Sequence, residues 1–290
     1  MNIKSISFWA IFLALSCLYA FAEGQSESPS NATQQEFGIQ LRTYMGRTPK
    51  AQNDSRLITY IEFSSNNRIK MWEDLEGVSA DMNVKSGQYL TSNENGLDFI
   101  TIYWSTGTQE KFLFLISDTI YLYNSDSTPY FDDFGGFGKV FGDGSWIKAS
   151  SSFQEIQGGK TVIYSPDKLG IKIGECWVPK KEKNEQLMLL FPPRTDGLWI
   201  SSGFVSFSRP YLYRENSRIK KIRLYNGSGY SKIVELKDTP HFQKVPIDDF
   251  PYGTILNIEI LEVYPGTKYS DTCVNSIFCD TYPGGDASGW

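Results

Sequence analysis

The residues in this sequence that are best suited to catalysis are two pairs of adjacent carboxylates and one histidine. Glycosidase chemistry needs two carboxyl groups that face each other across a substrate. The neighbours in Asp132-Asp133 and in Asp248-Asp249 would point to opposite faces of an extended strand. His241 follows Pro240 in a predicted surface loop, and no Ser-His-Asp arrangement surrounds it. These patterns predict that the protein is not an enzyme.

The cysteines do not indicate a metal centre. The chain has four cysteines, Cys17, Cys176, Cys273 and Cys279, and one histidine. Their spacing matches no zinc motif, so we predict neither a metal nor another cofactor. Removal of a signal peptide would leave an odd number of cysteines, of which one has no partner within the chain. Cys273 and Cys279 would close a short loop, whereas a Cys176–Cys273 pair would join distant segments.

The first residues have the pattern of an export signal. Lys4 precedes an apolar run over residues 6–21, which is shorter than the roughly 20 residues of a membrane-spanning helix. Ala20-Phe21-Ala22 predicts cleavage before Glu23, and therefore a periplasmic, surface-exposed or secreted protein with no integral membrane span. Alternatively, the sequence before Cys17 loosely matches a lipobox, and lipidation there would tether the chain.

Composition predicts a strand-rich protein that does not bind nucleic acid. Aromatic residues make up 15% of the chain, and the net charge is −5. Phosphate backbones require a concentrated basic surface, which an acidic chain does not favour. The length after cleavage suits two domains of ordinary size. We expect a signal peptide over residues 1–22 and a flexible polar linker over 23–36.

Short apolar runs with turn signals between them predict an antiparallel β domain over residues 37–129. The runs recur at intervals of about ten residues and are rich in β-branched and aromatic side chains; they cover residues 57–63, 68–72, 87–90, 99–104, 112–116 and 120–123. Closing such a meander into a small barrel would remove its exposed edges. The glycine-rich residues 130–145 are predicted to connect the domains.

The C-terminal half also has the pattern of an all-β domain. Residues 256–263 alternate between apolar and polar, which predicts a strand with one buried face. Further strands are expected at residues 187–191, 198–200, 219–225 and 233–236. The sequence contains no long helical pattern.

Several motifs in this half resemble a known family. The segments 213–222 (YRENSRIKKI), 234–240 (VELKDTP) and 261–273 (LEVYPGTKYSDTC) are similar, in this order, to the NADase-type glycan-binding domains. The resemblance implies a discoidin-like (galactose-binding-like) jelly-roll β-sandwich over residues 146–278, followed by a tail over 279–290. It also implies carbohydrate binding. No segment resembles the NAD-hydrolysing domain itself.

The same resemblance implies a sugar site in the loops at one end of the sandwich. Such sites combine an aromatic face with planar hydrogen-bonding groups. Trp177 is a candidate stacking platform or, alternatively, a core residue. Asp271 is a candidate ligand contact or a turn residue that bonds its own backbone. The full set of candidates is Tyr211, Tyr213, Arg214, Asn216, Lys268, Tyr269, Asp271 and Trp177.

The sequence departs from the family at positions that bear on calcium. Residues 169–174 (LGIKIG) lack the family's carboxylates, and Ser276 stands where the family has Glu. Because Ca²⁺ prefers six to eight oxygen ligands rich in carboxylate, we predict no structural calcium. The first and last strands of such jelly rolls lie close together, which implies a disulfide between Cys176 and Cys273. The predicted partner is a glycan. The alternatives are an envelope protein that binds the same loops and a hydrolase with a site between the domains.

Overall fold

The computed structural model of the protein describes residues 39–47, 57–75, 78–125, 129–133, 137–140, 147–190, 195–248, 250–251 and 254–281. The predicted signal peptide, the linker, Cys17 and most of the glycine-rich segment lie outside these residues. Within the described part of the chain, no helix is both long enough and apolar enough to cross a bilayer.

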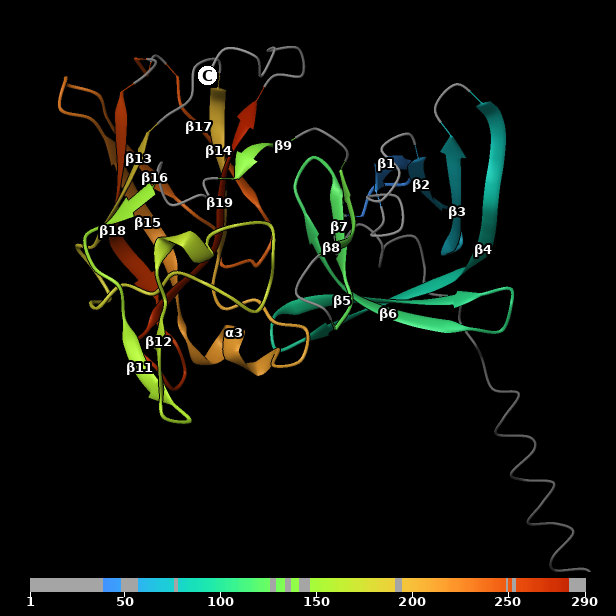
Figure 1. Ribbon diagram of the computed structural model, residues 1–290, viewed down its shortest axis with the longest axis horizontal. Helices are drawn as coiled ribbons and strands as arrows, with labels where there is room; N and C mark the ends of the chain where they lie inside the picture. The colour runs from blue at the N-terminus through green and yellow to red at the C-terminus, as the bar shows by residue number, and fades with distance from the viewer. Residues whose placement is uncertain are drawn as a thin grey trace, which may run out of the picture.

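The N-terminal domain is a closed barrel of eight strands (Figure 1). Each strand pairs antiparallel with the next in the chain, and β1 pairs with β8 to close the barrel. This confirms the predicted barrel-like meander. The strands are β1 (Thr43–Arg47), β2 (Leu57–Ser64), β3 (Arg68–Leu75), β4 (Val78–Glu94), β5 (Leu97–Trp104), β6 (Gln109–Ile116), β7 (Ile120–Tyr123) and β8 (Pro129–Asp133).

The interior of the barrel is filled by apolar side chains that alternate along the strands. On β5, Ile100, Ile102 and Trp104 belong to the barrel core, whereas Phe99 points to the outside. All four residues of β7 are buried, because this strand has the barrel core on one face and the second domain on the other. A strand that is covered on both faces has a continuous apolar run instead of an alternating one.

The C-terminal domain is a sandwich of two sheets around one apolar core (Figure 1). The strands run in the order β10-β13-β18-β15-β19-β14-β17, with β16 beside β15 and β9 beside β19. The all-β prediction is therefore confirmed. The strands are β9 (Phe137–Val140), β10 (Ile147–Ala149), β13 (Gln186–Leu190), β14 (Thr195–Ser202), β15 (Ser217–Tyr225), β16 (Ser231–Glu235), β17 (Gln243–Pro246), β18 (Ile255–Tyr264) and β19 (Thr272–Thr281).

The elements extend past the predicted domain boundaries. β8 continues to Asp133, and β9 lies inside the segment that was predicted to be a connection. β19 runs to Thr281, so the predicted tail over residues 279–290 begins inside a strand. All three differences arise because backbone pairing continues where side-chain patterning ends: β8 pairs with β1, β9 pairs with β19, and the end of β19 pairs with β14.

Three short elements lie at or beside one end of the sandwich, which is at the bottom of Figure 1. The hairpin of β11 (Gln154–Gln157) and β12 (Lys160–Ile163) forms a separate two-stranded sheet. A 3-10 helix, η2 (Pro166–Lys168), follows it, and the five-residue helix α3 (Tyr211–Glu215) precedes β15.

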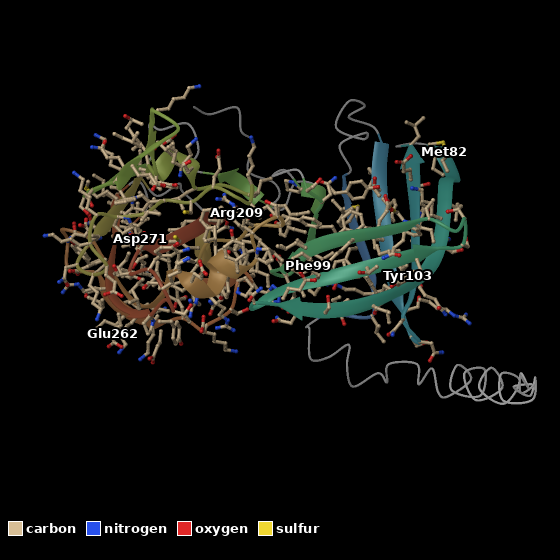
Figure 2. All side chains as sticks on the ribbon, turned by 90° about the horizontal axis from the view of Figure 1, so that it is seen from below. Met82, Phe99, Tyr103, Arg209, Glu262 and Asp271 are labelled. Carbon is tan, nitrogen blue, oxygen red and sulfur yellow. The ribbon has the colours of Figure 1, made fainter. Side chains whose placement is uncertain are left out.

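The barrel contacts the sandwich through a shared apolar cluster. Phe99 of β5 packs edge-on against Phe207, and Tyr121 of β7 packs against Phe242. Figure 2 shows Phe99 at this contact and Tyr103 on a distant part of the barrel. The backbone N–H of Phe242 also donates to the carbonyl oxygen of Ile116 at 3.0 Å. The two domains are therefore joined by buried contacts.

His241 takes part in this contact, so the prediction of a surface loop residue was wrong. Its ring stacks on Phe114 of the barrel, and its Nε2 lies 3.0 Å from Oδ2 of Asp98. Neither side chain is more than one-fifth exposed. This polar pair therefore supplements the apolar cluster, together with the hydrogen bond from the Tyr123 hydroxyl to the carbonyl oxygen of Ile171 at 2.6 Å.

Candidate functional site

The sandwich contains a cavity of about 250 Å³ between the β11–β12 hairpin, α3 and the loop before β19. It lies at the end of the sandwich where α3 and the hairpin are seen in Figure 1. This is smaller than the roughly 300–1,000 Å³ of pockets for drug-sized ligands. The lining residues are Phe153, Glu155, Gln157, Tyr164, Cys176, Val178, Phe204, Arg209, Leu212, Asn216, Tyr269, Asp271 and Cys273.

The hairpin supplies one wall of the cavity. The hydroxyl of Tyr164 and the Nε2 of Gln157 both donate to Oε1 of Glu155, each at 2.6 Å. These hydrogen bonds, with that of Tyr164 the stronger, lower the pKa of the Glu155 carboxyl. Burial and the neighbouring Glu155 raise the pKa of Tyr164, so its hydroxyl stays protonated. The Phe153 ring stacks on Tyr164 with centroids 6.1 Å apart.

The loop between β14 and α3 supplies the opposite wall. The guanidinium of Arg209 lies over the Phe204 ring, with its Cζ 5.1 Å from the ring centroid, a favourable cation–π geometry. Arg209 forms no ion pair among the residues that the structure describes. Its five N–H donors therefore remain available to a ligand.

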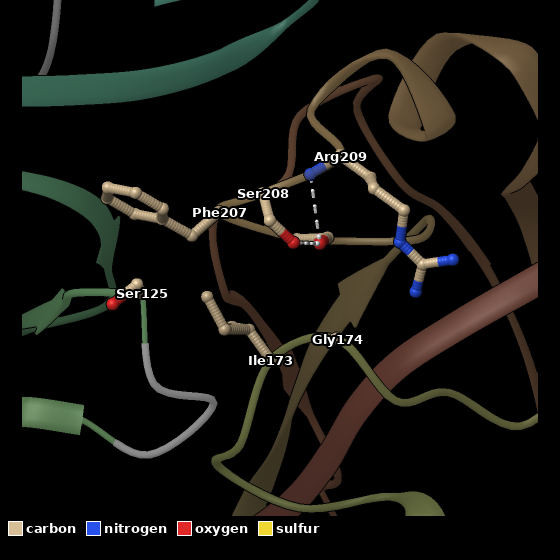
Figure 3. Close-up of a pocket in the computed structure, with 7 residues that line it drawn as sticks. Ser125, Ile173, Gly174, Phe207, Ser208 and Arg209 are labelled. Carbon is tan, nitrogen blue, oxygen red and sulfur yellow. Dashed lines mark hydrogen bonds between the residues drawn. The ribbon is translucent and has the colours of Figure 1, made fainter.

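A second, smaller cavity of about 110 Å³ lies behind this loop, next to Ser125 of the barrel domain. The backbone N–H of Arg209 donates to Oγ of Ser206 at 3.3 Å. In Figure 3 the Arg209 side chain extends away from Phe207 and Ser125. The serine contact fixes the backbone of the loop, and Arg209 lines both cavities.

Three of the predicted site residues meet in the larger cavity: Asn216, Tyr269 and Asp271. Tyr269 is 40% exposed, so its ring is accessible to a ligand. Burial, and then the charge of Glu155, raise the pKa of the Asp271 carboxyl. Tyr211, Arg214 and Lys268 lie outside the cavity lining; Lys268 lies beside it, with its Nζ 4.8 Å from the centre of the Tyr269 ring.

Trp177 and Tyr213 are structural residues, so their prediction as ligand contacts was wrong. Trp177 is fully buried in the sandwich core, and its Nε1 donates to the carbonyl oxygen of Ser151 at 3.0 Å. Tyr213 is fully buried in the cluster between the domains. Both side chains are aromatic, and an aromatic residue that fills a core has the same sequence signal as one that binds a sugar.

Tyr213 and Arg214 belong to a network around Asp238 that holds α3 in place. Asp238 accepts hydrogen bonds from Nε of Arg218 at 2.7 Å and from Nη1 of Arg214 at 2.9 Å. Burial would raise the pKa of Asp238, but these two arginines outweigh it and lower the pKa. Arg218 also donates to the carbonyl oxygens of Tyr213 and Asn216. The network therefore fixes the position from which Asn216 reaches the cavity.

The predicted disulfide between Cys176 and Cys273 is not formed; both residues are buried free thiols. Trp177 and Val274 pair across an isolated antiparallel bridge, which places the two cysteines on a diagonal. The Cys273 thiol is hydrogen-bonded to Cys176, and this contact and burial raise its pKa.

Sequence reasoning missed the hairpin wall and the arginine loop. The hairpin had a detectable signal, because Gly158-Gly159 between two short polar runs is a turn motif of hairpins. The loop carried no signal that distinguishes Arg209 from any other exposed arginine. The missed residues are Phe153, Glu155, Gln157, Tyr164, Phe204, Arg209 and Leu212.

Comparison with known proteins supports the class of the second domain. Residues 184–280 match the family model "NAD glycohydrolase translocation F5/8 type C domain". No curated protein matches the chain. A solved structure from Bacteroides fragilis, a two-domain protein of unknown function, is 11% identical over 87% of this chain and 99% of its own, with a TM-score of 0.28. The family match supports a discoidin-like domain in the C-terminal half of the protein.

Proposed function

We propose that this protein is an exported, non-catalytic carbohydrate-binding protein of the bacterial envelope, with its ligand in the cavity of the sandwich. The observation that carries the proposal is the composition of the cavity. The accessible ring of Tyr269 stands beside the Arg209 guanidinium and the Asp271 carboxyl, and among the described residues neither of these two polar groups forms an ion pair or a side-chain hydrogen bond. This combination is typical of a site for a polyhydroxylated ring.

In this proposal one group of residues stacks on the sugar and another forms hydrogen bonds with it. The Tyr269 ring is 40% exposed and can lie against the C–H face of a sugar. Arg209 can donate, and Asp271 can accept, hydrogen bonds with ring hydroxyls at the same time. Glu155 is already held by Tyr164 and Gln157, so its free oxygen is preorganised as a further acceptor.

A glycan array tests this proposal with a matched pair of tyrosine variants. Tyr269→Ala removes the stacking surface and is expected to weaken glycan binding at least tenfold, about 1.4 kcal/mol. Tyr103→Ala removes a ring that is 43% exposed on the distant barrel and should leave binding unchanged. A bound glycan whose affinity is the same in both variants would place the site elsewhere.

Export is tested by amino-terminal sequencing of the protein from the cell envelope. The expected mature chain begins at Glu23. A chain that begins at Cys17 and carries a lipid would establish a tethered form, and retention of Met1 in the cytoplasm would contradict export.

One observation favours a protein partner as the second candidate. Ile156, on the hairpin beside the cavity, is 77% exposed, and Ile163 on the same hairpin is nearly half exposed. Exposed apolar side chains close together indicate a surface for protein contact. A blank glycan array together with capture of one envelope protein, lost on Ile156→Ser, would support this candidate over the first.

A further inference from the structure

We propose that the barrel is a positioning domain for the larger cavity of the sandwich. Through Arg214 and Tyr213 it holds the helix α3, and α3 in turn holds the loop that presents Tyr269 to a ligand. The effect on ligand binding rests on the proposed function, whereas the effect on the loop can be measured without a ligand.

The barrel contacts α3 at β5 and at the turn before it (Figure 1). A Cβ on Gly96 would lie 2.5 Å from Nε and 2.9 Å from Nη2 of Arg214, so the turn packs directly on the guanidinium. The preceding helix residue, Tyr213, is buried in the same apolar cluster as Leu97 and Phe99. Two consecutive side chains of α3 therefore rest on one segment of the barrel.

The main chain of α3 holds the loop before β19. The carbonyl oxygen of Arg214 accepts a hydrogen bond from the backbone N–H of Thr267 at 3.0 Å. The carbonyl oxygen of Glu215 accepts hydrogen bonds from the backbone N–H groups of Lys268 and Tyr269 at 3.2 and 2.8 Å. Carbonyl groups at the end of a helix have no partner within the helix, and here the loop supplies the donors.

The loop is also packed closely against α3. A Cβ on Gly266 would lie 2.4 Å from the carbonyl oxygen of Glu215 and 2.3 Å from that of Tyr269. The backbone N–H of Gly266 donates to Oγ of Ser217 at 3.1 Å. Because the loop is both hydrogen-bonded and closely packed, a displacement of α3 moves Tyr269 with it.

The residues that such a displacement would move line the cavity. Leu212 of α3 and Asn216, which follows the helix, line it directly, and the loop adds Tyr269. None of the described barrel residues lines this cavity, so we expect the barrel to affect it through α3. By linkage, a ligand that binds only the ordered cavity strengthens the contact between α3 and the barrel by the same free energy.

The buried Arg218 keeps α3 folded when the barrel contact is weakened. Its Nη1 donates to the carbonyl oxygens of Tyr213 and Asn216 at 3.1 and 2.7 Å. Its Nε donates to Oδ1 of Asp238 at 2.7 Å. All of these groups belong to the sandwich. A change at the turn of the barrel is therefore expected to loosen the loop without unfolding the sandwich.

The test is amide hydrogen exchange of the full-length mature protein, with Gly96→Ala as the variant and Gly107→Ala as its control. Both glycines have a positive φ, but only a Cβ at Gly96 meets Arg214. In Gly96→Ala we expect roughly tenfold faster exchange at the Thr267 and Tyr269 amides. The amides of β13 and β18, which report global unfolding, should change no more than in the control. Gly107→Ala should leave both loop amides unchanged.

Two results of this experiment would overturn the proposal. A merely structural contact would accelerate exchange in β13 and β18 as much as in the loop. Unchanged exchange at Thr267 and Tyr269 in Gly96→Ala would show that the barrel does not hold the loop.

The glycan array then tests the coupling to the ligand. Gly96→Ala should need about threefold more protein for a half-maximal signal than Gly107→Ala. Equal signals would overturn the coupling. An array without any bound glycan would contradict the proposed function alone, because the exchange result does not depend on a ligand.

Discussion

The barrel and the sandwich differ in how far apart in the chain their adjacent strands lie. In the barrel every strand pairs with its neighbours in the chain, and the pairing of β1 with β8 leaves no edge. In the sandwich, strands distant in the chain are adjacent, and β15 pairs in parallel with the start of β19. The second arrangement needs long connections, and these connections form the cavity. Closure gives a rigid body, whereas crossovers give loops in which a site can form.

The largest loss of stability is expected when the core tryptophan of the sandwich is removed. Trp177→Ala is expected to cost about 3–5 kcal/mol of the free energy of unfolding, because it leaves a large internal cavity. Chemical denaturation monitored by circular dichroism measures this cost. The matched change in the barrel is Trp72→Ala, whose ring is only half-buried and stacks on Tyr60. That variant should lose much less stability.

The same variant tests the structural role assigned to Trp177. If Trp177→Ala retained full stability and lost only ligand binding, the residue would be a stacking platform and not part of the core.

A smaller effect is expected at the contact between the two domains. Gly96 has a φ of +89°, and a Cβ there would lie 2.5 Å from Nε of Arg214. Gly107 has a φ of +85° with open space around it. Alanine at either position pays the cost of a left-handed conformation, about 1 kcal/mol, but only Gly96→Ala also displaces Arg214 from the network of Asp238. The Tm of Gly96→Ala should therefore be the lower of the two.

Equal melting temperatures for the two alanine variants would mean that Arg214 moves aside without cost. In that case the contact between the barrel and α3 would not hold the cavity in shape.

The smallest effect concerns the polar pair between the domains. A double-mutant cycle of His241→Ala and Asp98→Ala is expected to give a coupling energy of about 0.5–1 kcal/mol, because the pair is only partly buried. The apolar cluster around Phe99 and Tyr121 should supply most of the interface stability. A coupling energy of several kcal/mol would instead make His241 the main connection between barrel and sandwich.

The fold was more predictable from sequence than the site. Alternation of residues 256–263 and the runs at 112–116 and 120–123 reflect how strands bury their faces, which is a local property. The boundary strand β9 was missed because its residues carry glycine and lysine, and pairing with β19 alone makes it a strand. Backbone pairing leaves little trace in side-chain types.

The site depends on which loops meet, and one sequence read alone does not show that. Asn216, Tyr269 and Asp271 were identified because they lie in motifs shared with a family. Tyr213 lies in one of the same motifs, yet both it and Trp177 fill cores. Glu155 and Arg209 lie in segments without such motifs, and tertiary contacts bring them to the cavity. Residue type therefore indicated the chemistry of the site but not which residues perform it.

The position of β19 has a consequence for the order of folding. This strand pairs with β9, β14 and β15 and bridges to Trp177, yet it is the last strand in chain order. The barrel has all its strands once Asp133 has been made, whereas the sandwich must wait for residues more than a hundred positions later. In that interval the outer face of the barrel, with Phe99 and Tyr121, has no cover. During synthesis the chain would therefore carry a folded barrel with an exposed apolar face. A chaperone could bind this face until the sandwich has folded.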